Sequence, residues 1–393
     1  SSQLLSALTL SSILKSKLLN TKVCLGGNYI SRITDAIRNN PDFFNIFADY
    51  VIYEEGELGI CQLLEFLENK RKIEDVSSLI YMSKDRNVVT TTKQEPIKLS
   101  ELAMSDLDGF NIKEYFLPEI IMPVQLSRGC YWQKCTFCDH YFGQTYNVKN
   151  IDVLINELKS FKLKYGINNF EFTDDCISPA FLQEFSQKIV DDGLKINWYC
   201  DLRLEKAFTK EILELAYKAG LKMVLWGFEA SSKRIMELIN KGIDIDYRLE
   251  ILRNASDVGI YNFAYIFTGF PSETYDEAME TANAMLDNSD IIHSYGTSIF
   301  SLGKYSIINI NPQKYGITKV INDEEFSSDI KYEADNSLPQ DDLLRIESIM
   351  SQKSLEKNNN PAWMYLRYRE LLFLYIVKYG KDKVVEMKYS YSN

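Results

Sequence analysis

The sequence predicts an α/β protein built on a mostly parallel six-stranded sheet within residues 111–301. Apolar runs of strand length alternate there with amphipathic helical segments. The connections between these runs are short, as in sheets whose neighbouring strands are joined by helices. At 393 residues the chain is long enough for two or three domains. We expect an α/β domain at 1–110, the six-stranded domain at 111–301 and a mostly helical C-terminal region at 302–393.

The elements of the six-stranded domain are expected in strict alternation. Thr209 is placed to begin one helix as its N-cap, and Gly220 follows the end of that helix. The expected strands are 120–126, 169–173, 197–202, 223–227, 261–268 and 292–300, and the expected helices are 151–165, 179–191, 209–219, 232–258 and 274–287.

The regions before and after the six-stranded domain have different sequence patterns. Leucines at helical spacing predict a helix over 1–19, and a short strand then ends at Gly26-Gly27. A second strand leads into the acidic loop 54–57. On local residues alone, the glycines form a tight turn and the acidic residues begin a helix. Two further helices are expected at 336–354 and 361–379, the second with an apolar face that covers the open sheet.

Composition excludes several classes of protein. The apolar fraction of 46% and the charged fraction of 25% are those of a globular protein. The longest apolar runs are shorter than the ~20 residues that span a bilayer, and no signal peptide is visible. A net charge of −11 disfavours a nucleic-acid partner. Seven cysteines form no regular disulfide framework, so we expect a cytoplasmic protein with reduced thiols.

Three cysteines in one short loop, Cys130, Cys135 and Cys138, are the most informative feature of the chain. A four-iron cluster held by three thiolates keeps one iron open for a substrate or cofactor. A closed zinc site that recruits His140 as fourth ligand is the alternative. A purely structural role in the core is disfavoured because the same loop carries charged residues, among them Arg128.

The cysteine loop follows the first expected strand, and Lys241-Gly242 and Gly269-Phe270-Pro271-Ser272-Glu273-Thr274 lie further along the chain. As a set, these motifs resemble the radical S-adenosylmethionine superfamily. More narrowly they are similar to its branch with an N-terminal cobalamin-binding domain, which contains methyltransferases that modify peptides and natural products. One departure is the gap of four residues between the first two cysteines, where the superfamily usually has three.

The resemblance implies a partial (β/α)6 barrel that carries a [4Fe-4S] cluster. The open iron would bind S-adenosylmethionine, whose reductive cleavage gives a 5′-deoxyadenosyl radical. It also implies contacts to that cofactor at the ends of the strands. Thr173 and Asp174 would grip the methionine amino group, although Asp174 or Asp175 can instead cap the helix at 179.

Four further contacts to the cofactor are expected. Arg203 suits a carboxylate by bidentate geometry, and Glu229 would accept from the methionine ammonium or the ribose hydroxyls. Gly269 would let main-chain groups read the adenine, against which Phe137 would pack.

The N-terminal domain resembles the later half of a doubly wound cobalamin-binding domain, with Gly26, Gly27, Glu55 and Gly56 near the corrin. The family's Asp-x-His-x-x-Gly motif does not occur, and the only histidines are His140 and His293. The sequence is therefore expected to be a fragment lacking ~80 residues, by the usual size of such domains, or to have lost the site. Cobalamin is expected to bind only to the full-length protein.

The leading functional hypothesis is cobalamin-dependent methylation, or another radical modification, of a peptide or natural product, such as the maturation of a ribosomally made peptide. Cobalamin-free cyclisation, epimerisation or methylthiolation is the second hypothesis. A zinc-stabilised binding module is the third. Expected partners are a peptide or small-molecule substrate and a reductant such as flavodoxin or ferredoxin, with no nucleic acid and no membrane.

Overall fold

The computed structural model describes residues 3–139, 145–322, 326–327, 329–358 and 369–387. The chain divides into two compact units. The first comprises 1–97 with 321–331, and the second comprises 98–320 with 332–393. Across the described residues, no helix is long and apolar enough to cross a membrane.

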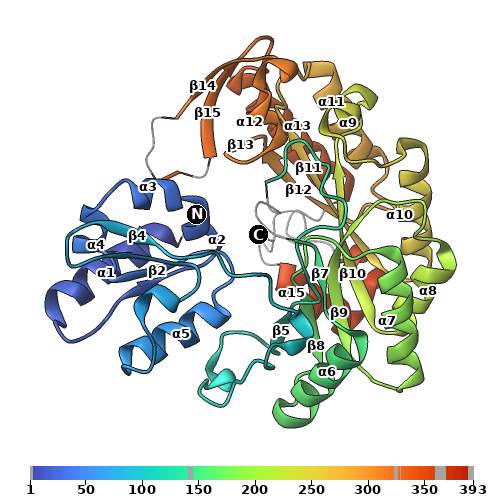
Figure 1. Cartoon of the computed structure of the whole chain (residues 1–393). Helices are drawn as coiled ribbons and strands as arrows, with labels where there is room; N and C mark the ends of the chain where they lie inside the picture. Colours follow the sequence, from blue (N-terminus) through green and yellow to red (C-terminus); the bar gives the residue numbers. More distant parts are fainter. Residues whose placement is uncertain (1–2, 140–144, 323–325, 328, 359–368, 388–393) are drawn as a thin grey trace, which may run out of the picture. The chain divides into compact units, whose positions relative to one another are not determined.

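The second unit is organised by an open six-stranded sheet with strand order β12-β11-β10-β9-β8-β5 (Figure 1). All of its neighbouring pairs are parallel, so the predicted partial barrel is confirmed. Pro123 lies in the edge strand, which tolerates a residue without an N–H group. The strands are β5 (Ile121–Val124), β8 (Asn169–Phe172), β9 (Asn197–Arg203), β10 (Leu221–Glu229), β11 (Tyr261–Thr268) and β12 (Ser294–Ile299).

Helices cover the outer face of this sheet. Alternate residues of each strand point to opposite faces, so one set of side chains packs against these helices. On β9, Trp198, Cys200 and Leu202 pack in the core formed with the outer helices. The predicted N-cap of α8 is confirmed, since Thr209 Oγ1 accepts from the N–H of Ile212. The outer helices are α6 (Ile151–Tyr165), α7 (Pro179–Asp191), α8 (Lys210–Lys218), α10 (Arg248–Asp257) and α11 (Tyr275–Asp287) (Figure 1).

The inner face of the sheet packs against a helix from the C-terminal region. Tyr199, Met223 and Tyr261 are fully buried in a second core. Helix α15 (Arg369–Tyr379) supplies Leu372, Phe373 and Ile376 to this core. The predicted helix over 361–379 thus covers the open sheet, although its residues 361–368 lie outside the described part of the chain.

The prediction of one helix over 232–258 is wrong. Helix α9 (Lys233–Ile239) ends where Asn240 takes a left-handed conformation, with φ 50°. Gly242 has φ 68°, and the 3-10 turn η4 (Ile245–Tyr247) precedes α10. The apolar pattern continues across the turn because Ile239 before it and Ile251 after it are both buried, so periodicity alone did not reveal the break.

The C-terminal region contains a small sheet of three strands in the order β13-β15-β14, which the sequence analysis did not predict. Its strands are short and carry exposed positions, so they lack a clear apolar alternation. The elements of this region are β13 (Leu302–Gly303), α12 (Ile307–Ile310), η5 (Pro312–Tyr315), β14 (Ile317–Ile321), β15 (Asp329–Ala334), α13 (Gln340–Asn358), α15 and α16 (Lys381–Glu386).

The first unit has a four-stranded sheet in the order β1-β2-β3-β4. Strands β1 and β2 are parallel, as in a doubly wound domain, but β3 and β4 continue antiparallel as a hairpin. Phe43, Val51 and Ile80 lie in its core. The elements are α1 (Leu4–Lys17), β1 (Cys24–Leu25), α2 (Asn28–Arg32), α3 (Thr34–Arg38), α4 (Asp42–Ile46), β2 (Tyr50–Ile52), α5 (Glu57–Leu67), η1 (Ile73–Asp75), β3 (Leu79–Met82) and β4 (Val88–Thr90).

A matched pair of glycines tests the packing of β9 against the turn that follows α8. A Cβ at Gly220 would lie 2.0 Å from the carbonyl oxygen of Ile196, at a φ of +104°. Gly166, with φ +72°, has nothing within 4 Å of such a Cβ. We expect Gly166→Ala to cost about 1–2 kcal/mol, the strain of a left-handed residue. Gly220→Ala should cost at least about 3 kcal/mol, because the backbone of β9 must also move.

Chemical denaturation of the two variants measures this difference. Equal losses of stability in the two variants would show that only the backbone conformation constrains Gly220. The backbone near β9 would then move aside for the added methyl group at no further cost.

Candidate functional site

The cysteine loop leaves the sheet at the carboxyl end of β5. A short ladder of β6 (Ser127–Arg128) with β7 (Asn147–Val148) fixes its first residues. Cys130, Cys135 and Cys138 are each half-buried, and none of them forms a disulfide. The thiols therefore lie on irregular backbone whose shape depends on contacts with neighbouring elements.

Thr136 fixes the middle of the loop to the end of α9. Its N–H donates to the carbonyl oxygen of Ile239 at 2.9 Å, and its hydroxyl donates to that of Leu238 at 2.7 Å. The last carbonyls of a helix have no partner within the helix. Thr136, between two of the cysteines, thus satisfies groups that α9 leaves open.

Trp132 makes a second contact with the same turn. Its indole Nε1 donates to the carbonyl oxygen of Asn240 at 3.0 Å. A Cβ on Gly242 would come within 2.0 Å of the indole ring, so only glycine allows this approach. The guanidinium of Arg203 lies 4.1 Å from the centre of that ring. The residue pair predicted as a signature, Lys241-Gly242, is therefore part of the support for the loop.

Asp174 holds the start of the loop from the opposite side. Its carboxylate accepts from the N–H of Leu126 at 2.9 Å and from the hydroxyl of Ser127 at 2.6 Å, and it also accepts from the N–H of Ser127. Burial raises the pKa of Asp174 to about 6, against the opposing effect of these hydrogen bonds. The alternative that Asp174 or Asp175 caps α7 is wrong, because Ser178 is the N-cap.

Glu229 and Lys241 form a buried ion pair at the end of β10. Glu229 has a φ of 66°, beside a register shift in the ladder with β11. A Cβ on Gly227 would lie 2.2 Å from Lys241 Nζ, so the missing side chain makes room for the pair. The pKa of Lys241 is raised overall: burial is the largest effect and lowers it, but the charges of Glu229 and Cys135 and the hydrogen bond to Glu229 together outweigh burial.

Arg203 lies at the end of β9 and is 4% exposed. Its Nη1 is 2.8 Å from the carboxylate of Glu205, and its Nη2 donates to the carbonyl oxygen of Lys241. Among the residues that the structure describes, the buried Nε has no hydrogen-bond partner. An unsatisfied N–H on a buried guanidinium is costly, and an acceptor bound at this position would remove that cost.

Three thiols on one loop are a donor set of the kind that holds iron–sulfur clusters. Burial raises the pKa of Cys135 to about 11, while the charges of Lys241 and Arg203 oppose this effect. In the described part of the chain, no three His, Cys, Asp or Glu side chains converge as the ligands of one metal ion. Thiolates around one zinc ion would be about 3.8 Å apart, from the usual Zn–S length. In a cluster each thiolate binds a different iron, so the three sulfur atoms lie further apart than around one zinc ion.

The proposed fourth zinc ligand, His140, lies outside the described residues. The donor set that the structure does describe consists of soft thiolates beside two buried cations, which favours an anionic cluster.

The residues expected around an adenine lie together at the end of β11. The ring of Phe137 is 5.2 Å from that of Phe267. Gly269 has a φ of +80°, and its N–H donates to Glu273 Oε2 at 2.5 Å. Glu273 is fully buried, its Oε1 has no hydrogen-bond partner, and burial raises its pKa to about 7. Thr173, in contrast, is an exposed side chain after β8.

The residues expected near a corrin meet within the first unit. Gly27, with φ 97°, precedes α2, and its carbonyl oxygen accepts from the hydroxyl of Ser31 at 3.0 Å. The same hydroxyl accepts from the N–H of Glu54 at 2.8 Å. Parallel pairing of β1 with β2 thus joins the Gly26-Gly27 turn to the acidic loop. Gly56 is the N-cap of α5, and Glu55 accepts from the N–H of Ile97 at 2.9 Å.

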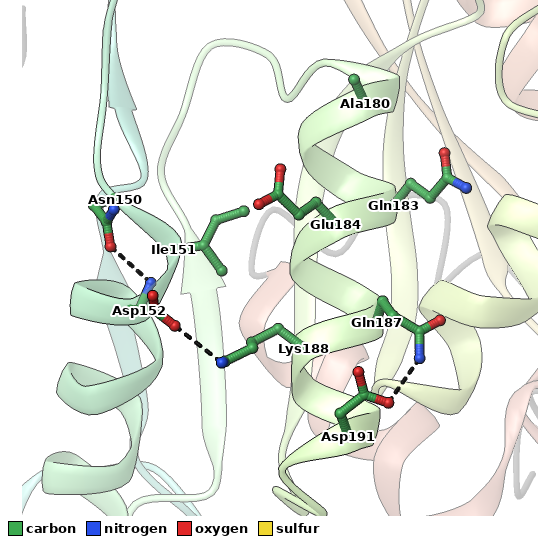
Figure 2. Close-up of a pocket in the computed structure, with 9 residues that line it drawn as sticks. All are labelled: Asn150, Ile151, Asp152, Ala180, Gln183, Glu184, Gln187, Lys188 and Asp191. Carbon is green, nitrogen blue, oxygen red and sulfur yellow. Dashed lines mark hydrogen bonds and ion pairs between the residues drawn. The ribbon is translucent and has the colours of Figure 1, made fainter.

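A hollow of about 550 Å³ between α6 and α7 lies away from these residues, on the outer side of the sheet (Figure 2). It is lined by polar side chains that pair with one another, such as Asp152 with Lys188 at 3.0 Å. No cysteine lines it, so it does not belong to the candidate site.

Residues 124–285 match the model of the radical SAM superfamily. By this match, residues 124–285 are a radical SAM domain. The matched range contains the cysteine loop and the ends of β8, β9, β10 and β11.

The curated relatives include proteins named as methyltransferases. An uncharacterized methyltransferase of Pyrococcus horikoshii is 27% identical over 283 residues, which cover 70% of this chain and 60% of the relative. Cytidylyl-2-hydroxyethylphosphonate methyltransferase of Streptomyces wedmorensis is 21% identical over 315 residues, which cover 70% of this chain and 58% of that relative. The chain therefore spans about 60% of the length of such relatives.

Two solved structures share the fold. The cobalamin-dependent S-adenosylmethionine radical enzyme OxsB, with aqua-cobalamin and S-adenosylmethionine bound, has a TM-score of 0.70 at 14% identity, covering 96% of this chain and 61% of OxsB. The radical S-adenosylmethionine methyltransferase TsrM of Kitasatospora setae, with cobalamin and a [4Fe-4S] cluster bound, has a TM-score of 0.66 at 15% identity. The match covers 86% of this chain and 74% of TsrM.

The contact between Asp174 and Ser127 yields a prediction about the loop. In Asp174→Asn one carboxylate oxygen becomes an NH₂ group, which faces an N–H instead of accepting from it. We expect a loss of about 2 kcal/mol in stability, the value of a hydrogen bond to a charged group. Chemical denaturation measures it. Asp175→Asn is the matched control, because Asp175 is exposed. Equal effects of the two substitutions would contradict the role assigned to Asp174.

Proposed function

We propose that this protein is a radical S-adenosylmethionine enzyme that holds a [4Fe-4S] cluster on Cys130, Cys135 and Cys138. The observation that carries the proposal is the placement of three thiols on a loop supported by α9, at the strand ends that bear Arg203 and Glu229. When bound, the cluster supplies the electron for reductive cleavage of S-adenosylmethionine.

The chain's own residues would bind and orient that cofactor. Arg203 offers its unsatisfied Nε to a carboxylate. Glu229, held by Lys241, offers an acceptor to an ammonium or to hydroxyl groups. Phe137 and the turn at Gly269 provide an apolar ring and main-chain groups for the adenine, and Glu273 keeps that turn in shape. Thr173 is the remaining expected contact to the methionine end.

Asp174 contributes indirectly in this proposal. Its carboxylate is engaged with Leu126 and Ser127, so it positions the cysteine loop and does not grip the cofactor directly. Lys241 likewise acts through Glu229 and through its charge on Cys135.

We further propose that the whole protein is a cobalamin-dependent methyltransferase for a peptide or natural product. Methylation is supported by the relatives that are named as methyltransferases. Other relatives are named as a methylthiotransferase and a cyclase. The meeting of Gly26, Gly27, Glu55 and Gly56 at the ends of two parallel strands supports a ligand site in the first unit. In this proposal 1–110 is the cobalamin-binding-like domain, 111–301 the catalytic barrel and 302–393 its cover. A reductant such as flavodoxin or ferredoxin in the cytoplasm would supply electrons.

The cluster ligands are tested by Cys135→Ala. Three thiolates are the fewest that hold such a cluster and leave one iron open, so the variant should lose most of its iron and the brown colour of the anaerobically purified protein. Iron and sulfide analysis measures this. Cys61→Ala, at an exposed position of α5, is the control and should keep both. Full iron content in the Cys135 variant would refute the assignment.

Cofactor binding is tested by Arg203→Ala and Glu229→Ala. Each should weaken S-adenosylmethionine binding by roughly 1.5–3 kcal/mol, the range for hydrogen bonds to charged groups. Equilibrium binding to the reconstituted protein would register this as a roughly 10- to 150-fold rise in Kd. Arg253→Ala removes an exposed arginine paired with Asp290 and should leave the Kd unchanged. Retained affinity in both site variants, with normal iron content, would make these residues structural.

A further inference from the structure

The inner face of the sheet changes from apolar to charged along the strands. On β9 the inward side chains are, in order, Tyr199, Asp201 and Arg203. Tyr199 is fully buried, and its ring is 4.9 Å from that of Phe373 in α15. Arg203 belongs to the support of the cysteine loop. Asp201 therefore lies between the apolar packing of α15 and the candidate cofactor site.

Asp201 belongs to a group of polar side chains from four elements, which we name the inner polar layer. The layer consists of Glu171 of β8, Asp201 of β9, Tyr265 of β11 and Arg369 of α15. Arg369 Nη1 donates to the hydroxyl of Tyr265. The charge of Arg369 acts on both Asp201 and Glu171, and the two carboxylates act on one another.

The inner polar layer carries more negative than positive charge. Glu171 and Asp201 face a single guanidinium, and Glu370 adds a third carboxylate near Glu171. Lys241 also acts on Asp201, but it is already paired with Glu229. Carboxylates in an enclosed position are costly unless a cation compensates them.

The charge of Arg369 acts on Asp201, but among the described residues the two form no ion pair. The carboxylate of Asp201 makes no hydrogen bond or ion pair with any residue in the described part of the chain. Its side chain is half-buried, and burial raises its pKa to about 7. A carboxylate that lacks a hydrogen bond and an ion pair, beside a second carboxylate, can bind a positively charged group.

The inner polar layer is also reachable. Asp201, Glu171 and Tyr265 lie on strands with a neighbour on each side, yet all three side chains are only half-buried. The apolar residues in register with them, Met223 and Tyr261 beside Glu171 and Leu225 beside Asp201, are fully buried. The polar side chains alone are partly exposed among these buried neighbours, so a small group can reach them.

We propose that Asp201 and Glu171 bind a positively charged nitrogen of the substrate, a protonated amine or a guanidinium. A metal ion is disfavoured, because no three potential metal ligands converge among the residues that the structure describes. The proposal rests on the proposed function, since it makes this cation part of the molecule that the radical chemistry modifies. It narrows the substrate class to amine- or guanidine-bearing peptides and small molecules.

The test uses n-butylammonium as the probe and saturation-transfer NMR, which detects weak binding. The chain should bind n-butylammonium saturably, and neutral 1-butanol and anionic butyrate should bind at least 10-fold more weakly. Asp201→Asn and Glu171→Gln keep the size of each side chain but remove its charge, so each should raise the Kd at least 10-fold. Asp152→Asn, on the outer face of the sheet (Figure 2), should leave the Kd unchanged.

Two results would overturn the cation site: equal binding of 1-butanol or butyrate, or unchanged affinity in a folded Glu171 or Asp201 variant. Iron content and cleavage of S-adenosylmethionine are measured on the same samples. A sample that cleaves S-adenosylmethionine but does not bind the amine refutes the cation site alone. A sample that binds the amine but holds no iron refutes the proposed function and leaves the cation site supported.

Discussion

The site depends on how an irregular loop is held in place. A loop without secondary structure has many conformations. Three thiols can bind one cluster only if contacts with the rest of the protein exclude most of these conformations. Thr136 does this from one side by pairing with the carbonyls that α9 cannot satisfy internally. Asp174 does it from the other side by holding Ser127. Both supports come from elements of the sheet-and-helix core, so the packing of that core sets the geometry of the thiols.

The alternation of side chains on the strands links stability to chemistry. On β9, Trp198 and Leu202 pack with the outer helices, while Tyr199 packs on α15. Towards the carboxyl ends of the strands, the inner face carries charged groups instead. Among these groups, Arg203 and the Glu229–Lys241 pair meet the cysteine loop. A charged residue on this face is tolerated because apolar contacts on both sides of the sheet already stabilise the strand.

Much of this architecture could be read from the sequence, and the exceptions have physical reasons. The helices at 151–165 and 179–191 and the strand at 261–268 were predicted with their bounds, because their caps and apolar patterns are strong. The break after Ile239 was missed because apolar residues continue across it. The thiols were found from their spacing. The roles of Thr136 and Asp174 were not, because their partners lie 102 and 47 residues away and local patterns carry no such information. Asp201 gave only a weak signal, a polar residue within a strand.

The central claim is that three thiolates hold a cluster with one open iron. Electron paramagnetic resonance of the reduced, anaerobically purified protein, with and without S-adenosylmethionine, tests it most directly. The account predicts a [4Fe-4S] signal that changes when S-adenosylmethionine binds, because the cofactor becomes a ligand of the open iron. A protein without iron, or a cluster signal that S-adenosylmethionine leaves unaltered, would contradict it.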